Sequence, residues 1–219
     1  FPGKRIYLTD EIIHNPRVNE RLRELGIRFL RGTYAAQEQL GDLGSGDVAI
    51  IPAFGVPTKD QAALQERGCI VVDATCGSVV NVWRRVESYA NDEFTAIIHG
   101  KYWHEETIAT ASRVTQYPAG KFLIVLDKPQ AQVVCDYIIR GGSREAFLQT
   151  FAGATSEGFD PEHDLARVGV ANQTTMLSSE SLEIEEMFRV AIRERYGDDD
   201  LPRRFRAFDT ICSATQDRQ

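Results

Sequence analysis

Short apolar runs alternate with amphipathic stretches along most of the chain. The runs have the length of β-strands and are mostly continuous rather than alternating, as is typical of strands buried on both faces. They predict strands at residues 5–9, 48–52, 70–73, 94–99, 122–126, 168–171 and 205–211. Between them, apolar residues that recur every three or four positions predict amphipathic helices. These helices are expected at residues 16–25, 59–67, 79–90, 105–113, 131–139, 144–151 and 184–192.

This alternation predicts an α/β fold of repeated strand–helix units with mostly parallel sheets. The chain holds more elements than one four-stranded layer needs, so we expect residues 1–76 to form a first α/β unit and residues 77–204 a second. Residues 205–219 would then start a third, truncated unit. The chain begins at Phe1 and stops at Gln219 without the features of a finished fold. We therefore expect an interior piece of a longer protein, whose first unit lacks its N-terminal segment.

Composition and charge narrow the class of protein. The 25 lysines and arginines are outnumbered by 32 acidic residues, and the net charge of −7 disfavours nucleic acid or another polyanion as a partner. Hydrophobic residues make up 42% and charged residues 26%, which is typical of globular domains. No apolar run approaches the roughly 18 residues that a membrane helix needs. We expect a soluble globular protein with no membrane partner.

Polar residues gather in five segments at the predicted carboxyl ends of strands. Loops at that edge of a parallel sheet lead into helix N-termini and commonly form the binding sites of α/β proteins. We therefore expect the five segments to converge on one site. They are residues 10–15, 73–79, 99–107, 171–175 and 209–216.

Two of the four cysteines lie in these segments. Cys76 and Cys212 are each expected to follow a strand and precede a helix, where the amide dipoles favour a thiolate. Burial as small apolar residues is the alternative interpretation, and spacing alone slightly favours it. Cys69 and Cys135 fall within apolar periodicity, which favours packing roles for both.

His104 and Glu106 lie in the first turn of a predicted helix, beside a strand end. There a carboxylic acid can transfer protons and a histidine can hydrogen-bond an anion, although the acid could equally complement the helix dipole. Thr174 and Thr175 follow another strand in the segment ANQTT, which suits a phosphate or an oxyanion, or else caps the next helix. His14 is a lone histidine after the first strand, for which a structural role is equally open.

Six motifs together resemble the 4-hydroxy-3-methylbut-2-enyl diphosphate reductase family, in its plant and cyanobacterial branch. The resemblance runs nearly end to end and in order, and it implies that the chain is the central portion of such a protein. The family's fold is a pseudo-threefold arrangement of three α/β units, of which this chain would hold two. The motifs are EIIHNPRVNERL (11–22), PAFG (52–55), VVDATC (71–76), IIHGKYWHEETIATAS (97–112), GVANQTTML (169–177) and TICSATQDRQ (210–219).

The resemblance implies an iron–sulfur oxidoreductase of non-mevalonate isoprenoid biosynthesis. The family removes the hydroxyl of 4-hydroxy-3-methylbut-2-enyl diphosphate reductively, and the products are isopentenyl and dimethylallyl diphosphate. A ferredoxin or flavodoxin is the implied electron donor. The implied location is the cytoplasm, or the plastid if the source is a plant.

The same resemblance assigns roles to single residues. His14 and His104 match histidines that hold the substrate's diphosphate. Glu106 matches the glutamate that delivers protons, and Thr174 matches a threonine beside the substrate hydroxyl. Thr175, its neighbour in the QTT motif, is a further candidate for substrate binding, ranked below Thr174.

Cys76 and Cys212 match two of the three cysteines that hold the family's 4Fe–4S cluster. The third cysteine ligand precedes the segment that this chain covers. Gly77 stands where the family commonly has proline, and Phe54 stands where the bacterial branch has another diphosphate-binding histidine. We therefore expect the 219 residues alone to be inactive and unable to assemble a stable cluster. The alternative is a truncated, cluster-free α/β module that binds an anionic ligand or a partner without catalysis.

Overall fold

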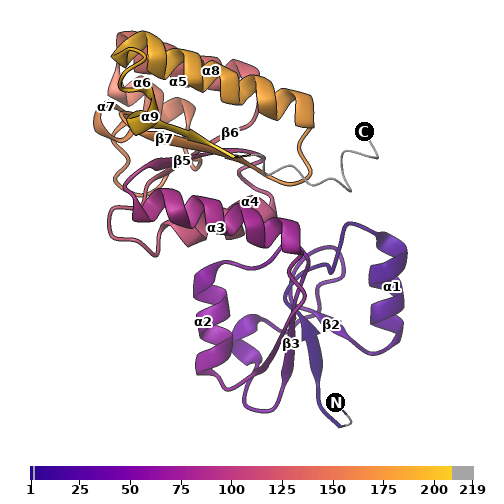
Figure 1. The fold of residues 1–219 in the computed structure, drawn as a ribbon. Helices are drawn as coiled ribbons and strands as arrows, with labels where there is room; N and C mark the ends of the chain where they lie inside the picture. Colours follow the sequence, from indigo (N-terminus) through magenta and orange to yellow (C-terminus); the bar gives the residue numbers. More distant parts are fainter. Residues whose placement is uncertain (2, 209–219) are drawn as a thin grey trace. The chain divides into compact units, whose positions relative to one another are not determined.

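The computed structural model describes residue 1 and residues 3–208 of the chain (Figure 1). The chain divides into two compact units, Phe1–Val79 and Val80–Gln219. Each unit contains one four-stranded sheet, and all the strand pairs of both sheets are parallel. These sheets confirm the predicted α/β fold.

The first unit has the strand order β2-β1-β3-β4. Its central strands are buried, and its core includes Tyr7, Ala49 and Leu64. The two-residue strand β2 has no counterpart among the predicted strands. The elements are β1 (Ile6–Leu8), α1 (Pro16–Glu24), β2 (Arg28–Phe29), the 3-10 turn η1 (Leu40–Asp42), β3 (Val48–Ile51), α2 (Thr58–Glu66) and β4 (Ile70–Asp73).

An N-terminal cap and a glycine set the two ends of helix α1. The side chain of Asn15 accepts hydrogen bonds from the backbone N–H groups of Arg17 and Val18, and Pro16 occupies the first helical position. Gly26, at φ +84°, takes the left-handed conformation that follows the helix. The cap therefore fixes the start of α1 two residues after His14.

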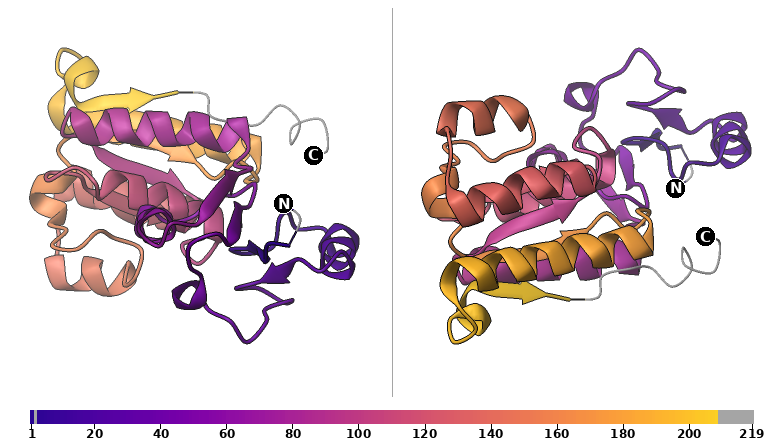
Figure 2. Two further views of the ribbon diagram at one scale, coloured as in Figure 1. Left: turned by 90° about the horizontal axis from the view of Figure 1, so that it is seen from below. Right: turned by 90° about the horizontal axis from the view of Figure 1, so that it is seen from above.

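The second unit has the strand order β6-β5-β7-β8 and helices on both faces of the sheet. Helices α3 and α4 cover one face, and α5 and α8 cover the other (Figures 1 and 2). In the described part of the chain, no helix combines the length and the apolar character that crossing a bilayer requires. The elements are α3 (Gly77–Asn91, which starts in the first unit), β5 (Thr95–His99), α4 (Glu105–Val114), β6 (Phe122–Val125), α5 (Lys128–Arg140), α6 (Arg144–Thr150), α7 (Pro161–Asp164), β7 (Val168–Asn172), α8 (Ser178–Tyr196), α9 (Leu201–Arg204) and β8 (Phe205–Ala207).

Strand β8 extends the second sheet past the boundary drawn from the sequence at residue 204. Residues 205–207 pair in parallel with residues 168–170 of β7. Helix α9 ends at the residue before β8, so the chain returns directly to the edge of β7, and residues 205–207 belong to this sheet. The predicted strand continued to residue 211, but its end lies outside the described residues.

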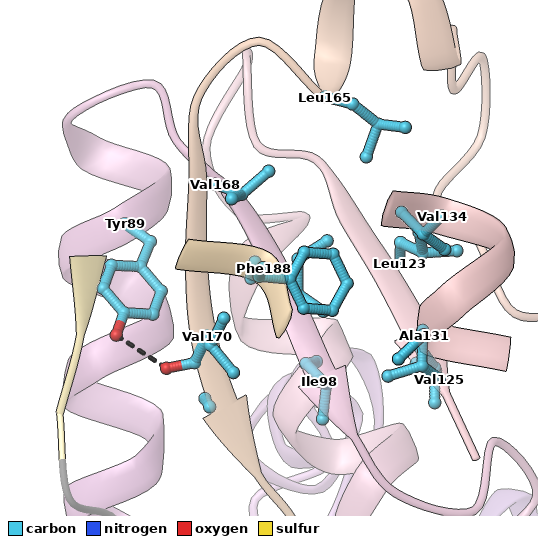
Figure 3. Packing of buried hydrophobic residues seen from close by; sticks show 14 of the residues in the cluster. Tyr89, Ile98, Leu123, Val125, Ala131, Val134, Leu165, Val168, Val170 and Phe188 are labelled. Carbon is cyan, nitrogen blue, oxygen red and sulfur yellow. Dashed lines mark hydrogen bonds between the residues drawn. The ribbon is translucent and has the colours of Figure 1, made fainter. Parts of the chain in front are cut away.

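A close contact between Gly169 and Tyr89 fixes helix α3 against strand β7. Tyr89 is fully buried, and its hydroxyl donates a 2.9 Å hydrogen bond to the carbonyl oxygen of Val170 (Figure 3). A Cβ atom at position 169 would lie 2.6 Å from the Tyr89 ring. Glycine is therefore a steric requirement in the strand that leads into the segment 171–175.

Replacing Gly169 with alanine should lower the free energy of unfolding by about 1–3 kcal/mol, because the buried Tyr89 ring would have to shift in a close-packed core. Trp83 and Trp103 both lie in the second unit, so their fluorescence during urea unfolding reports on it. The control is Gly142→Ala, whose Cβ would meet only an ordinary 3.4 Å contact. Equal unfolding midpoints for the two variants would contradict this account of the packing.

Candidate functional site

Helix α4 presents a buried carboxylic acid at the carboxyl end of strand β5. The helix starts at Glu105, and the Nδ1 atom of the capping residue His104 accepts the backbone N–H of Glu106 at 3.1 Å. Glu106 is 0% exposed, whereas the side chain of Glu105 is 40% exposed. One acid of the first turn is therefore buried and the other is accessible to solvent.

Thr174 of the β7–α8 loop binds both carboxylate oxygens of Glu106. The backbone N–H of Thr174 donates to Oε1 at 2.5 Å, and the Thr174 hydroxyl donates to Oε2 at 2.8 Å. Burial raises the pKa of Glu106 to about 6, and the two Thr174 donors oppose that rise because they stabilise the charged form. An acid with this pKa can both hold and release a proton near neutral pH.

Gln173 connects the same two segments through its buried amide. Its Oε1 accepts from the backbone N–H of Lys101 and from the hydroxyl of Thr107, both at 3.1 Å, and its Nε2 donates to the exposed hydroxyl of Thr175 at 2.7 Å. The segment ANQTT was expected to bind an anion, but the amide of Gln173 already makes these hydrogen bonds within the protein. Thr107 lies in the predicted segment 99–107 but was not singled out there, although its place directly after Glu106 at a predicted helix start was a usable signal.

A second buried polar contact lies at the end of strand β5. His99 is 0% exposed, and its Nδ1 lies 2.9 Å from the hydroxyl oxygen of Ser181 in helix α8. Burial lowers the pKa of His99, because desolvation disfavours the charged imidazolium. The sequence carried no signal for Ser181, since the pairing depends on which helix covers that face of the sheet.

In the first unit, three of the motifs, at residues 11–22, 52–55 and 71–76, meet at one edge. The backbone N–H of Ala53 donates to the carbonyl of Ile12 at 3.1 Å, and the N–H of Cys76 donates to the carbonyl of Ala53 at 3.0 Å. The ring of His14 stacks on Phe54 with a centroid separation of 4.3 Å. The carboxyl ends of this unit's strands therefore carry a histidine and a thiol on hydrogen-bonded loops.

The described cysteines differ in their suitability as metal ligands. Cys76 is exposed, Cys69 is partly buried, and Cys135 is buried. Burial raises the pKa of the Cys69 thiol, and it raises the pKa of Cys135 to about 12, so both favour the inert thiol. Among the described cysteines, Cys76 alone is an accessible ligand that fits a metal cluster. Cys212 and the rest of the segment 209–216 lie outside the described residues.

The structure brings predicted residues together within each unit. His104, Glu106 and Thr174 form one cluster in the second unit, as their placement at strand ends predicts. His14 and Cys76 share one edge of the first unit. Their roles toward a substrate or a cluster stay predictions.

Comparison with known proteins identifies the family of this chain. A family model described as "LytB protein" matches residues 2–219. A protein of Synechococcus sp. (strain RCC307) is 52% identical over the whole chain, and one of Thermosynechococcus vestitus is 51% identical. Both are named 4-hydroxy-3-methylbut-2-enyl diphosphate reductase. The chain covers 52% and 53% of these relatives, so it spans about half of their length.

Two solved structures share the fold. A structure of (E)-4-hydroxy-3-methyl-but-2-enyl diphosphate reductase, 25% identical, superposes with a TM-score of 0.67 over 99% of this chain and 60% of the other. The Plasmodium falciparum E-1-hydroxy-2-methyl-but-2-enyl-4-diphosphate reductase has a TM-score of 0.68 at 20% identity, over 99% of this chain and 54% of the other. With a family match over nearly its whole length, this chain belongs to the LytB protein family, which confirms the resemblance drawn from its motifs.

Proposed function

We propose that the protein containing this chain reduces 4-hydroxy-3-methylbut-2-enyl diphosphate to isopentenyl and dimethylallyl diphosphate. The observation that carries this proposal is the buried pair of Glu106 and Thr174 at the strand ends of a LytB-family chain. The names of its relatives support the same reaction. The protein would then be an oxidoreductase of non-mevalonate isoprenoid biosynthesis.

The proposed reaction consumes two electrons and two protons. The allylic C–O bond breaks, a C–H bond forms with one proton, and the hydroxyl leaves as water with the other. The electrons would come from a one-electron carrier such as a ferredoxin or flavodoxin. The reaction would take place in the cytoplasm, or in the plastid if the protein is from a plant.

Glu106 would supply the proton that the leaving hydroxyl needs. Its pKa of about 6 leaves a protonated fraction at neutral pH, which is the condition for a general acid. After the proton leaves, the carboxylate is stabilised by the two hydrogen bonds from Thr174. Thr174 would thus act both on the acid and, through its hydroxyl, beside the substrate hydroxyl.

The histidines would hold the diphosphate. The Nδ1 atom of His104 accepts the N–H of Glu106, so the neutral ring carries its proton on Nε2, the tautomer that can donate to a phosphate oxygen. His14 is kept in orientation by its stack on Phe54. Thr175 would be a further hydroxyl donor to the substrate. Anchoring the diphosphate would fix the allylic end relative to Glu106 and lower the entropic cost of reaction.

Cys76 and Cys212 would hold a 4Fe–4S cluster as two of its three cysteine ligands. When bound, such a cluster supplies one-electron transfer and an open iron that acts as a Lewis acid. The exposed thiol of Cys76, on a loop that is hydrogen-bonded at the carboxyl end of strand β4, fits a ligand role. The raised thiol pKa of the buried Cys135 does not fit such a role.

Replacing Cys76 with serine in the full-length protein should abolish the visible absorbance of the cluster after anaerobic reconstitution with iron and sulfide. The matched control, Cys69→Ser, should keep that absorbance, because Cys69 is a partly buried packing residue. Cys76→Ser protein that retains both colour and turnover would remove Cys76 from the ligand set. A colourless full-length parent would favour the cluster-free module instead.

Replacing Glu106 with glutamine should lower kcat by about 10²–10⁴-fold while the cluster absorbance stays unchanged, because the amide keeps the shape but cannot donate the proton. The accessible neighbour provides the control, and Glu105→Gln should stay within a few fold of the parent. In the parent, kcat/KM should fall as the pH rises through a pKa of about 6, since the protonated acid is the active form. Turnover of Glu106→Gln at the parental rate would contradict the role of this acid.

A further inference from the structure

Gln173 makes a junction between three pieces of chain at the carboxyl edge of the second sheet. It follows the last residue of β7 and is only 3% exposed. Its amide oxygen takes one hydrogen bond from the β5–α4 loop at Lys101 and one from helix α4 at Thr107. Its amide nitrogen donates to Thr175 in its own loop. The side chain therefore uses both its acceptor and its donor within the protein.

The surroundings of Gln173 are shaped to fit this amide. A Cβ atom at Gly100 would lie 2.8 Å from the hydroxyl oxygen of Thr107, 3.0 Å from Cβ of Gln173 and 3.2 Å from its Oε1. Any larger residue at position 100 would push these groups apart. The glycine in the sequence His99-Gly100-Lys101 thus makes room for the contact between α4 and the β7–α8 loop.

The side-chain hydrogen bonds of Gln173 and Thr174 lie next to each other, and both connect the β7–α8 loop to helix α4. Gln173 binds Thr107, and the next residue, Thr174, binds Glu106, which precedes Thr107 in α4. A further hydrogen bond runs from the backbone N–H of Gln173 to the carbonyl of His99, at the end of β5, at 2.8 Å. Without the hydrogen bond between the Thr107 and Gln173 side chains, fewer bonds would hold the β7–α8 loop to this edge of the sheet. The loss would occur directly beside Thr174, which carries both donors to Glu106.

We propose that Gln173 is a positioning residue, whose amide fixes the β7–α8 loop so that Thr174 donates both of its hydrogen bonds to Glu106. Gln173 acts through Thr174 and not on the reacting atoms. Its importance for turnover rests on the proposed function, whereas the geometric claim about Glu106 does not. A role for the same amide as a direct ligand of the diphosphate is the competing interpretation.

The proposal has a measurable consequence for the proton on Glu106. The causes that set this carboxyl's pKa are burial, which raises it, and the two Thr174 donors, which lower it. His104 and Glu105 lie at the start of its own helix, and Thr174 faces it from the β7–α8 loop. If Thr174 moves away while the acid stays buried, the pKa of Glu106 must rise further.

The test measures the pKa of Glu106 by carboxyl ¹³C NMR in the 219-residue chain, with the resonance assigned from Glu106→Gln. Thr107→Val removes one hydroxyl without changing the side-chain shape, and Gln173→Met removes every polar contact of the amide. Both should raise the pKa of Glu106, Gln173→Met by about one pH unit, which is the size of one lost hydrogen bond to a charged group. The double variant should match Gln173→Met, because the two changes remove the same interaction.

Two controls separate positioning from general loss of structure. Thr107→Ser keeps the hydroxyl and should restore the parental pKa of Glu106. Thr110→Val makes the same substitution as Thr107→Val at a buried threonine of the same helix, and it should leave that pKa unchanged. If Gln173→Met fails to fold, the comparison of Thr107→Val with Thr107→Ser and Thr110→Val decides the question.

A pKa of Glu106 that is the same in Thr107→Val, Gln173→Met and the parent would overturn the proposal. In the full-length protein, loss of positioning should lower kcat and move the descending limb of the pH profile upward, with KM for the substrate little changed. A large rise in KM with an unchanged pKa would show that the amide binds the diphosphate instead. A full-length parent without reductase activity would refute the proposed function, while the pKa comparison would still test the positioning role.

Discussion

Burying the carboxyl of Glu106 against Thr174 is the constraint on which the second unit's site depends. Removal from water destabilises an ionised carboxylate, so burial raises the pKa of the acid. The backbone N–H and the hydroxyl of Thr174 offset part of that cost, and the resulting pKa is about 6. The acid is therefore neither permanently protonated nor permanently charged, and its chemistry depends on how firmly Thr174 is held.

The parallel sheet makes that arrangement possible. Strands β5 and β7 pair so that His99 lies beside Asn172, and the segments that follow both strands leave the sheet at the same edge. Helix α4, which carries Glu106, starts from the first segment, and Thr174 lies in the second. Glu106 and Thr174 therefore meet although they are 68 residues apart in the chain. Tyr89 anchors β7 through its hydrogen bond to Val170 (Figure 3) and through the fit of its ring over Gly169, so the loop that carries Thr174 starts from a fixed strand.

The sequence predicted most of the elements because continuous apolar strands and amphipathic helices leave distinct periodic patterns. It did not predict β2, since two residues are too few to show a period, and it did not predict that β8 pairs with β7 in the second sheet. The motifs singled out Glu106, His104 and Thr174. Their places after the carboxyl ends of parallel strands predicted that they would meet at one edge of the sheet. The partners of Gln173 could not be predicted, because they depend on side-chain directions and on the space left at Gly100.

The most direct test of this account is a titration of the Glu106 carboxyl in the parent chain and in Thr174→Val. We expect a pKa of about 6 in the parent, clearly above the usual glutamate value of 4.5, and a higher value in the variant. The rise is expected because valine removes the hydroxyl donor but leaves the acid buried. A parental pKa near 4.5, or a variant pKa that does not rise, would contradict the claim that burial and Thr174 together set this proton.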